Sequence, residues 1–521
     1  MQTLGYALNS SRQLPFSLAA LSGVLLVLSF PKFGSSGFAW VALAPLLVAV
    51  QRAPIRQAFL LGLTTGAIYF TGTLYWITSV MAVYGGLPTI VAVLINGLLI
   101  AYLSLFPAAF AVIAARLSHA FGPRGLAVAP CAWVATELGR SYLMTGFPWV
   151  LLGYSQVSVP PVAQFGSVLG VFGLSGLVAS VSAGLAYSAA VQWSGTTAAR
   201  PRVFAAYLPV GVAIVVTLAI GAWGAARIAR GDLTRAGDPV TVGLIQGNVD
   251  QADKWDPSRA AEIFRQYLSM TRRAIAAGAQ MVLWPESSTP FFFEEDRPGA
   301  EQVRAIAREA TVPILVGSDQ VVRSTPPAYY NAAFLVGPDG ETRGVYRKMH
   351  LVPFGEYVPL KKLLFFAAPL VEAVSDFTAG EALSLLPVRG RFMSTAICYE
   401  IVYPDLVRAS VNAGSDLLTT ITNDAWFGPS SAPYQHFEQA SMRAIENGRY
   451  LVRAANTGIS GIVDPYGRVI VSTPIFEPHV VVGQARFLRD RTIYSRIGDV
   501  FAYASTVCTI AALLLVWRRV R

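Results

Sequence analysis

Long apolar runs, almost free of charged residues, are the feature that most limits the possible folds of this chain. They fill the chain from Leu14 to about Ile228, with short polar breaks between them. One more run, Val500–Trp517, precedes a basic C-terminal tail. A helix that crosses a bilayer needs about 20 predominantly apolar residues. A mean hydropathy of +0.50 and a charged fraction of 13% are wrong for a wholly soluble protein, so membrane spans are the first expectation.

Eight runs are candidate membrane spans, and the second is short whereas the fourth and sixth are long, which predicts tilted or re-entrant segments. They are Leu14–Phe30, Gly37–Val50, Ala58–Val80, Leu87–Ala115, Leu126–Leu143, Val162–Val191, Phe204–Ile228 and Val500–Trp517. Charged residues occur throughout the segment from Pro239 to about Arg491, as in a soluble α/β domain. We therefore expect an N-terminal transmembrane block of about seven helices over residues 1–230 and a globular domain over 239–491. A C-terminal transmembrane helix with a basic tail over 498–521 completes this organisation.

Arginines in alternate loops predict the orientation of these spans. The loops after the second, fourth, sixth and eighth spans hold Arg52 and Arg56, Arg116 and Arg124, Arg200 and Arg202, and Arg518, Arg519 and Arg521. The opposite loops are poorer in positive charge, with Lys32 alone in one of them. The positive-inside rule places both termini in the cytoplasm and the globular domain outside. Three arginines just beyond the seventh span, Arg227, Arg230 and Arg235, favour the opposite orientation. Their effect is weaker because a long domain can be translocated largely regardless of its charge. We expect Met1–Arg12 to flank the first span rather than to be a cleaved signal peptide.

The charge and cysteine content exclude two classes of protein. The net charge of +10 comes without a lysine-rich tract or a basic, aromatic-interleaved segment, so we expect no nucleic-acid binding. Three cysteines are too few for a disulfide framework. Cys131 and Cys508 lie inside apolar runs and are expected to be small buried hydrophobic residues. Cys398 is the only cysteine of the globular segment. A single unpaired thiol is what a cysteine nucleophile would look like in the sequence.

Chemically reactive side chains stand at the ends of apolar, strand-like runs in the globular segment. Glu286 follows Met281–Trp284, Lys348 follows Gly344–Arg347, and Cys398 follows Met393–Ile397. Only the thiolate form of cysteine is a strong nucleophile, so a carboxylate that takes the proton is needed. Glu286 is the candidate base, with a pKa that burial is expected to raise, and Lys348 is the candidate oxyanion stabiliser.

Each of these residues also has a purely structural interpretation. Cys398 could be core packing, Glu286 could cap the next turn, and Lys348 could be a solvated strand end. The occurrence of all three at strand ends is physically compatible with the catalytic interpretation, which a family resemblance of the surrounding motifs favours. His350 and His436 stand apart from other ligand-type residues, so we expect no metal site.

The motifs Trp284-Pro285-Glu286, Tyr346-Arg347-Lys348 with Pro353–Glu356, and Cys398-Tyr399-Glu400 resemble the carbon–nitrogen hydrolase (nitrilase) superfamily in order and spacing. The resemblance implies a Glu286–Lys348–Cys398 triad in an α-β-β-α sandwich. The fold class is therefore a multi-pass α-helical membrane block plus an α/β nitrilase-like domain. The alternation of strands and helices in the globular segment is consistent with such a sandwich.

With spans on either side of the globular domain, the chain is similar to the membrane-embedded branch of that superfamily that acylates bacterial lipoproteins. The resemblance implies supporting or substrate-binding roles for Glu356, Tyr399, Glu400 and Trp255. Glu356 could orient Lys348 or share proton traffic with Glu286, and the residues leave both options open.

That branch implies a reaction in which both substrates are lipids. A phospholipid donates a fatty acyl chain to Cys398 as a thioester, and the α-amino group of the N-terminal S-diacylglyceryl cysteine of an apolipoprotein accepts it. It also implies a monomer in the bacterial inner membrane and no cofactor. The residues alone give a cysteine acyltransferase or amidase. A membrane-tethered hydrolase that uses water, and an inactive transporter or assembly scaffold, are the alternatives.

Two apolar stretches of the globular segment, Pro290–Phe293 and Leu360 to about Phe377, could be plain core or loops that enter the bilayer and admit acyl chains. We favour the second interpretation because the domain is tethered to a membrane.

Overall fold

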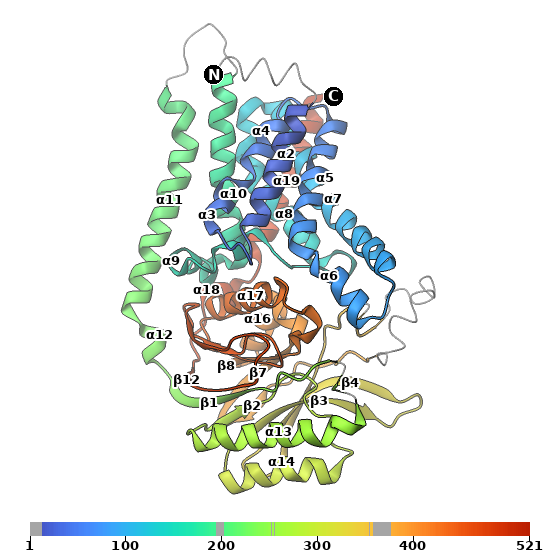
Figure 1. Cartoon of the computed structure of the whole chain (residues 1–521). Coiled ribbons are helices and arrows are strands. Elements are labelled where there is room, and N and C mark those ends of the chain that lie inside the picture. Colours follow the sequence, from blue (N-terminus) through green and yellow to red (C-terminus); the bar gives the residue numbers. More distant parts are fainter. Residues whose placement is uncertain are drawn as a thin grey trace. The chain divides into compact units, whose positions relative to one another are not determined.

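The computed structural model describes residues 13–193, 203–251, 253–254, 256–353, 355–357 and 377–520. These residues form two compact units (Figure 1). The first contains the segments Met1–Trp76, Val93–Arg230 and Ile497–Arg521. The second contains Ile77–Ala92 and Gly231–Arg496.

The first unit is built from apolar helices that run close together (Figure 1). Its main helices are α2 (Gln13–Leu28), α3 (Ser36–Ala42), α4 (Ala44–Val50), α5 (Ile55–Leu74), α7 (Thr89–Phe121), α8 (Ala129–Tyr142), α10 (Gly166–Trp193), α11 (Val203–Arg230) and α19 (Val500–Val520). Small residues allow the close approach of helices α5 and α7. A Cβ atom on Gly62 of α5 would lie 2.5 Å from the backbone of Ala108 in α7, so a larger residue would push the two helices apart.

Among the described residues, four helical stretches are long and apolar enough to cross a membrane. They are Thr89–Thr145, Gly166–Gln192, Phe204–Arg235 and Val500–Arg519. A fifth arises if Ile55–Leu74 and Trp76–Tyr84, which meet at a 50° bend, form one span. The first two candidate spans of the sequence correspond to shorter apolar helices, Gln13–Leu28 and Ser36–Val50, and the fourth and fifth fall within the single stretch Thr89–Thr145.

Two buried ionisable residues of α8 hold the backbone that follows this helix. Arg140 donates to the carbonyl oxygens of Trp149 at 2.6 Å and Phe147 at 3.2 Å. Glu137 accepts the backbone N–H of Leu152 at 2.7 Å. Buried backbone polar groups need hydrogen-bond partners, so these two side chains stabilise the backbone conformation of the segment that follows α8.

The second unit contains two six-stranded sheets. The first has the order β12-β1-β2-β3-β4-β5 and the second β11-β10-β9-β8-β7-β6. The strands of the first sheet are β1 (Asp238–Gln246), β2 (Met281–Leu283), β3 (Ile314–Val322), β4 (Ala328–Val336), β5 (Thr342–Arg347) and β12 (His479–Phe487). Those of the second are β6 (Leu386–Val388), β7 (Arg391–Ile397), β8 (Leu417–Thr422), β9 (Leu451–Ala455), β10 (Gly461–Val463) and β11 (Val469–Ser472).

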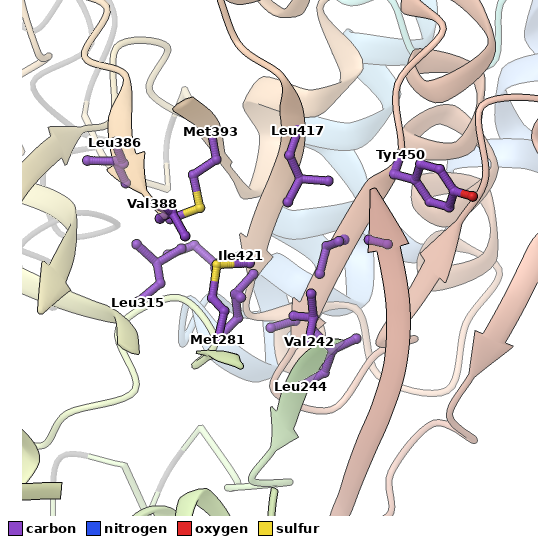
Figure 2. Close-up of a cluster of buried hydrophobic side chains, with 14 of the residues drawn as sticks. Val242, Leu244, Met281, Leu315, Leu386, Val388, Met393, Leu417, Ile421 and Tyr450 are labelled. Carbon is purple, nitrogen blue, oxygen red and sulfur yellow. The ribbon is translucent and has the colours of Figure 1, made fainter. Parts of the chain in front are cut away.

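The two faces of the first sheet bury different partners, because successive side chains of a strand point to opposite faces. Val242 and Leu244 of β1 pack with Leu417 and Ile421 of the second sheet in one apolar cluster (Figure 2). Ile245 of the same strand belongs instead to a cluster with helices α13 (Pro257–Ala276) and α14 (Arg297–Ala310). Both sheets pair parallel and antiparallel strands, so each is mixed.

Helices complete the sandwich on the outer face of each sheet. In Figure 1, α13 and α14 cover the first sheet, and α16 (Pro404–Asn412) and α17 (Ala432–Asn447) cover the second. The expected α-β-β-α sandwich is therefore confirmed, together with a helical block whose apolar helices could span a membrane.

The apolar stretch Pro290–Phe293 belongs to the core of this sandwich. Phe293 is fully buried against Phe334, and Phe291 packs edge-on against Phe264 of α13. The plain-core interpretation therefore holds for Phe291 and Phe293, which belong to the cluster of α13, α14 and the first sheet, whereas Phe292 is half-buried and packs against Tyr329. Nearly all of the second stretch, Leu360 to about Phe377, lies outside the described residues.

Candidate active site

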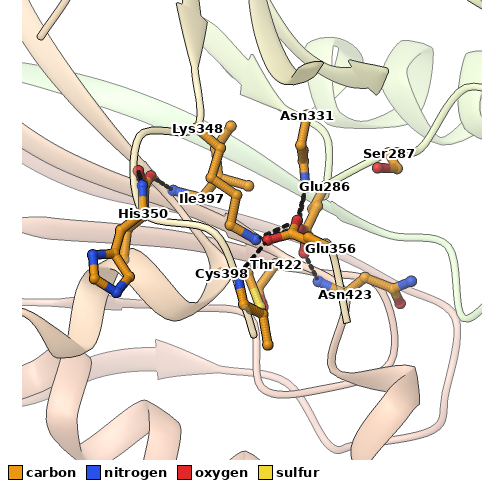
Figure 3. Close-up of polar contacts among 12 residues, drawn as sticks. Glu286, Ser287, Asn331, Lys348, His350, Glu356, Ile397, Cys398, Thr422 and Asn423 are labelled. Atoms are coloured by element: carbon orange, nitrogen blue, oxygen red, sulfur yellow. Dashed lines mark hydrogen bonds and ion pairs between the residues drawn. The ribbon is translucent and has the colours of Figure 1, made fainter. Parts of the chain in front are cut away.

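Three strand ends bring the predicted triad together inside the second unit. Glu286 follows β2, Lys348 directly follows β5, and Cys398 directly follows β7. All three side chains are buried, and they point toward one another in Figure 3. Because β2 and β5 belong to one sheet and β7 to the other, the triad lies where the two sheets meet.

Glu286 is held by donors from three different segments. Its Oε1 accepts the side-chain amide of Asn331 at 2.7 Å and the Nζ of Lys348 at 3.3 Å. Its Oε2 accepts the backbone N–H of Asn423 at 2.8 Å. These bonds fix both carboxylate oxygens (Figure 3).

Lys348 lies between two carboxylates. Its Nζ donates to Glu356 Oε1 at 2.8 Å, which is shorter than its 3.3 Å contact with Glu286. Asn331 also donates to Glu356 Oε1, at 2.9 Å, and the backbone N–H of Val352 donates to Glu356 Oε2 at 2.8 Å. The lysine and the asparagine therefore bridge the same two carboxylates.

The charges in this cluster set the protonation states of its members. Burial favours the neutral form of Lys348, but Glu356 and Glu286 outweigh it and the pKa of Lys348 is raised. Burial alone would raise the pKa of Glu286. Lys348, the amide of Asn331, Lys254 and the N–H of Asn423 outweigh burial, so the pKa of Glu286 is lowered. The sequence-based expectation of a raised pKa for Glu286 was wrong, because the ammonium and the donors around it stabilise its charged form.

The surroundings of Cys398 favour the protonated thiol. Burial raises the pKa of its thiol, the negative charge of Glu286 raises it further, and Lys348 acts in the opposite direction. Its backbone has a φ of +52°, a left-handed conformation that is uncommon for a residue with a side chain. Such strain persists only where neighbouring contacts hold it, and it concentrates at functional sites. The cluster therefore pairs a neutral thiol with an ionised carboxylate that can accept its proton.

Glu400 connects the segment of Lys348 to the turn of Cys398. Its Oε1 accepts the backbone N–H of Met349 at 2.6 Å and of His350 at 3.1 Å, together with the Tyr346 hydroxyl at 2.9 Å. Its Oε2 accepts the N–H of Ile397 at 2.7 Å. Burial raises the pKa of Glu400 to about 7, although these N–H donors act in the opposite direction. One fully buried side chain thus holds the two loops that carry the ammonium and the thiol.

Tyr399 and Trp255 are the two remaining residues that the sequence assigned to the site. Tyr399 is nearly buried and packs edge-on against Tyr403, which in turn stacks on His350 with ring centroids 3.8 Å apart. Trp255 lies outside the described residues. No group of three or more His, Cys, Asp and Glu side chains within the described ranges could hold a metal ion.

Sequence reasoning missed several groups around the triad. Asn331, in the middle of β4, gave no signal because an asparagine in a strand is not a catalytic motif. Nothing in the sequence around Asn423 indicated that its backbone N–H would contact Glu286. Lys254, also buried, affects the pKa of Glu286 through its charge.

Two family models and several known proteins match this chain. Residues 241–487 match the carbon–nitrogen hydrolase family, and residues 22–184 match the apolipoprotein N-acyltransferase N-terminal domain. A Geobacter metallireducens protein named apolipoprotein N-acyltransferase is 42% identical over 97% of this chain and 95% of its own length. A Methylococcus capsulatus protein of the same name is 36% identical over 92% of both chains. The crystal structure of Saccharomyces cerevisiae Nit3, a nitrilase-superfamily member, aligns with 48% of this chain and 90% of its own at 16% identity and a TM-score of 0.38.

The sandwich and the match over residues 241–487 define a carbon–nitrogen hydrolase domain of the nitrilase superfamily, so the resemblance stated from the motifs is confirmed. Identity over nearly the whole length adds the helical block to the match. The chain belongs to the apolipoprotein N-acyltransferase family.

Proposed function

We propose that the protein transfers a fatty acyl chain from a membrane phospholipid to the α-amino group of the N-terminal S-diacylglyceryl cysteine of an apolipoprotein. The observation that carries the proposal is a buried thiol beside an ionised carboxylate and an ammonium, in a chain of this family. Cofactors have no place in this mechanism, because the three side chains supply nucleophile, base and oxyanion stabilisation.

In the first half-reaction, Glu286 takes the proton of Cys398 as the sulfur attacks the ester carbonyl of the phospholipid. Lys348 and the backbone N–H of Tyr399 stabilise the oxyanion that forms. The tetrahedral intermediate then collapses, the carbon–oxygen ester bond breaks, and the proton on Glu286 passes to the departing alkoxide. The products are a lysophospholipid and a thioester on Cys398.

In the second half-reaction, the neutral α-amine of the lipoprotein attacks the thioester, and Glu286 accepts a proton from the nitrogen. The carbon–sulfur bond breaks, the proton returns to the thiolate, and the product is an amide. Glu356 orients Lys348, a role supported by its shorter contact with the ammonium. Glu400 holds the two loops that carry Lys348 and Cys398, and Tyr399 and Trp255 line the substrate site.

The proposed location is the bacterial inner membrane, with the catalytic domain on the outer face and both termini in the cytoplasm. The alternation of arginine-rich and arginine-poor loops supports this topology. We assign the membrane block to residues 1–230, the catalytic domain to 239–491 and the closing helix to 498–521, in a monomer.

A green fluorescent protein fused after the last residue of this chain is expected to fluoresce, because it matures in the cytoplasm. A dark fusion that is expressed at normal levels would contradict the topology.

The proposed acceptor distinguishes acyl transfer from hydrolysis. We expect the purified protein, mixed with phospholipid and a diacylglyceryl lipopeptide, to form one amide-linked lipopeptide for each lysophospholipid released. An N-acetylated lipopeptide, which has no free amine, is the matched control and should receive no acyl chain. Equal release of free fatty acid with both lipopeptides, without amide product, would instead show a hydrolase that uses water.

The pKa directions predict a broad pH profile for the first half-reaction. Glu286 remains ionised above its ordinary pKa of 4.5 and Lys348 remains charged below its ordinary 10.5, because their pKa values are lowered and raised respectively. We expect the single-turnover rate of thioester formation to be constant between about pH 5 and pH 9 and to fall only in stronger acid. The second half-reaction should lose rate below about pH 8, where the α-amine is protonated. A decline of thioester formation between about pH 6 and pH 7 would show instead that the base has a raised pKa.

A further inference from the structure

The carbonyl oxygen of Cys398 is held by a histidine from another element. His436 of α17 contacts this oxygen through Nε2 at 3.1 Å. The other ring nitrogen, Nδ1, lies 3.0 Å from Nη2 of Arg453 and 3.2 Å from Oδ1 of Asp424. Arg453 completes the cluster by donating to Asp424 Oδ2 at 2.8 Å. All three side chains are fully buried.

The neighbouring groups define the protonation of His436. A carbonyl oxygen only accepts hydrogen bonds, so Nε2 must carry a proton. Nδ1 lies within hydrogen-bond distance of the Arg453 guanidinium, which only donates, and of the Asp424 carboxylate, which only accepts, so the proton on Nε2 does not depend on which of them it pairs with. Burial and the charge of Arg453 lower the pKa of His436, whereas Asp424 and the Cys398 carbonyl act in the opposite direction. The cluster therefore presents an Nε2–H donor to the Cys398 carbonyl.

This bond acts on a residue whose backbone is in the left-handed region. Cys398 has a φ of +52°, and the peptide that follows it joins its carbonyl to the N–H of Tyr399. The peptide unit is planar and its N–H points away from its C=O, so a donor that holds the oxygen also sets the direction of the N–H. The second oxyanion donor of the proposed mechanism is this same N–H.

We propose that Arg453, Asp424 and His436 are positioning residues that orient the Cys398–Tyr399 peptide, so that its N–H meets the oxyanion in both half-reactions. The inference rests on the proposed function, since it concerns the oxyanion of that acyl transfer. Arg453 on β9 and Asp424 after β8 hold the ring of His436, and the ring holds the peptide. The role of His436 is therefore separate from both the base Glu286 and metal binding.

Two reactions of the same thiol test this role. Thioester formation from a labelled phospholipid creates an oxyanion, whereas alkylation of Cys398 by iodoacetamide does not. We expect His436→Leu, which removes the donor, to lower the single-turnover rate of thioester formation about 100-fold with little change in KM. The alkylation rate should stay within about threefold of that of the unmodified protein, because no oxyanion donor is involved.

A conservative pair of variants keeps the test decisive if His436→Leu does not fold. His436→Gln keeps an N–H near the position of Nε2 and should recover thioester formation to within about tenfold of the unmodified protein. His436→Asn is too short to reach the carbonyl and should remain as slow as His436→Leu. Equal rates for the glutamine and asparagine variants would overturn the inference.

The remaining outcomes separate this inference from the proposed function. A parallel loss of alkylation and thioester formation in His436→Leu would overturn the inference, because it would show a general structural role. Unchanged thioester formation in that variant would also overturn it. Absence of thioester in the unmodified protein, with normal alkylation, would reject the proposed acyl transfer itself.

Discussion

Replacement of Cys398 by alanine is expected to abolish both thioester formation and lipopeptide acylation. The residue supplies the sulfur that carries the acyl chain, and no other cysteine lies in the second unit. We expect the free energy of unfolding to change by less than about 2 kcal/mol, because the substitution removes a single heavy atom. Acyl transfer from radiolabelled phospholipid, followed in membranes with matched protein levels, measures the effect.

The other two cysteines provide matched controls for this substitution. Cys131 and Cys508 lie in helices of the first unit, and their replacement by alanine is expected to leave acyl transfer within about twofold of the unmodified rate. Activity in Cys398→Ala above that of an empty membrane, or an acyl label on Cys131 or Cys508, would contradict the role of Cys398.

Replacement of Glu286 by glutamine is expected to lower the rate of thioester formation about 1,000-fold, because a general base is lost. The electrostatic effect of the substitution acts in the opposite direction. The charge of Glu286 raises the pKa of the Cys398 thiol, so its removal makes the thiol more acidic. If Glu286 affected the site only through its charge, Glu286→Gln would form the thioester at least as fast as the unmodified protein.

Glu356→Gln is the matched control for this second prediction. This substitution also removes a negative charge that contacts Lys348, but Glu356 is not assigned to take a proton from the thiol. We expect a smaller decrease, about 10- to 100-fold, from the poorer positioning of the ammonium. Both rates come from quenched single-turnover reactions with excess enzyme. Equal decreases in the two glutamine variants would contradict the assignment of Glu286 as the base.

The strands that carry the triad could be predicted because each is a short apolar run with a polar residue at its end. Met281–Trp284 and Met393–Ile397 are short apolar runs, which predicts buried strands. Glu286 and Cys398 follow these runs and were therefore expected at the ends of the strands. The resemblance of three motifs then indicated the sandwich, which the structure confirms.

The electrostatics of the site could not be predicted in the same way. The pKa of Glu286 depends on Lys348, Asn331 and Asn423, which approach it only after folding. Sequence position shows that Glu286 is buried, and burial alone raises the pKa of a carboxyl group. The ammonium and the donors reverse that direction, so the sign required the structure.

Apolar runs were a poor guide wherever two environments accept the same residues. Phe291 and Phe293 suit a bilayer as well as a protein core, and only the packing against Phe264 and Phe334 decides between them. The boundaries of the membrane helices have the same ambiguity. Gln13–Leu28 and Ser36–Val50 are apolar enough for a span but short, so length and composition do not settle their number.

The central claim is that the acyl chain passes through a covalent bond to Cys398. Mass spectrometry of the protein after incubation with a phospholipid of defined acyl chains, without any lipopeptide, tests it most directly. The account predicts a peptide containing Cys398 that is heavier by one acyl group of the donor, and the loss of this adduct when a diacylglyceryl lipopeptide is added. An unmodified Cys398 in protein that still acylates the lipopeptide would contradict the account.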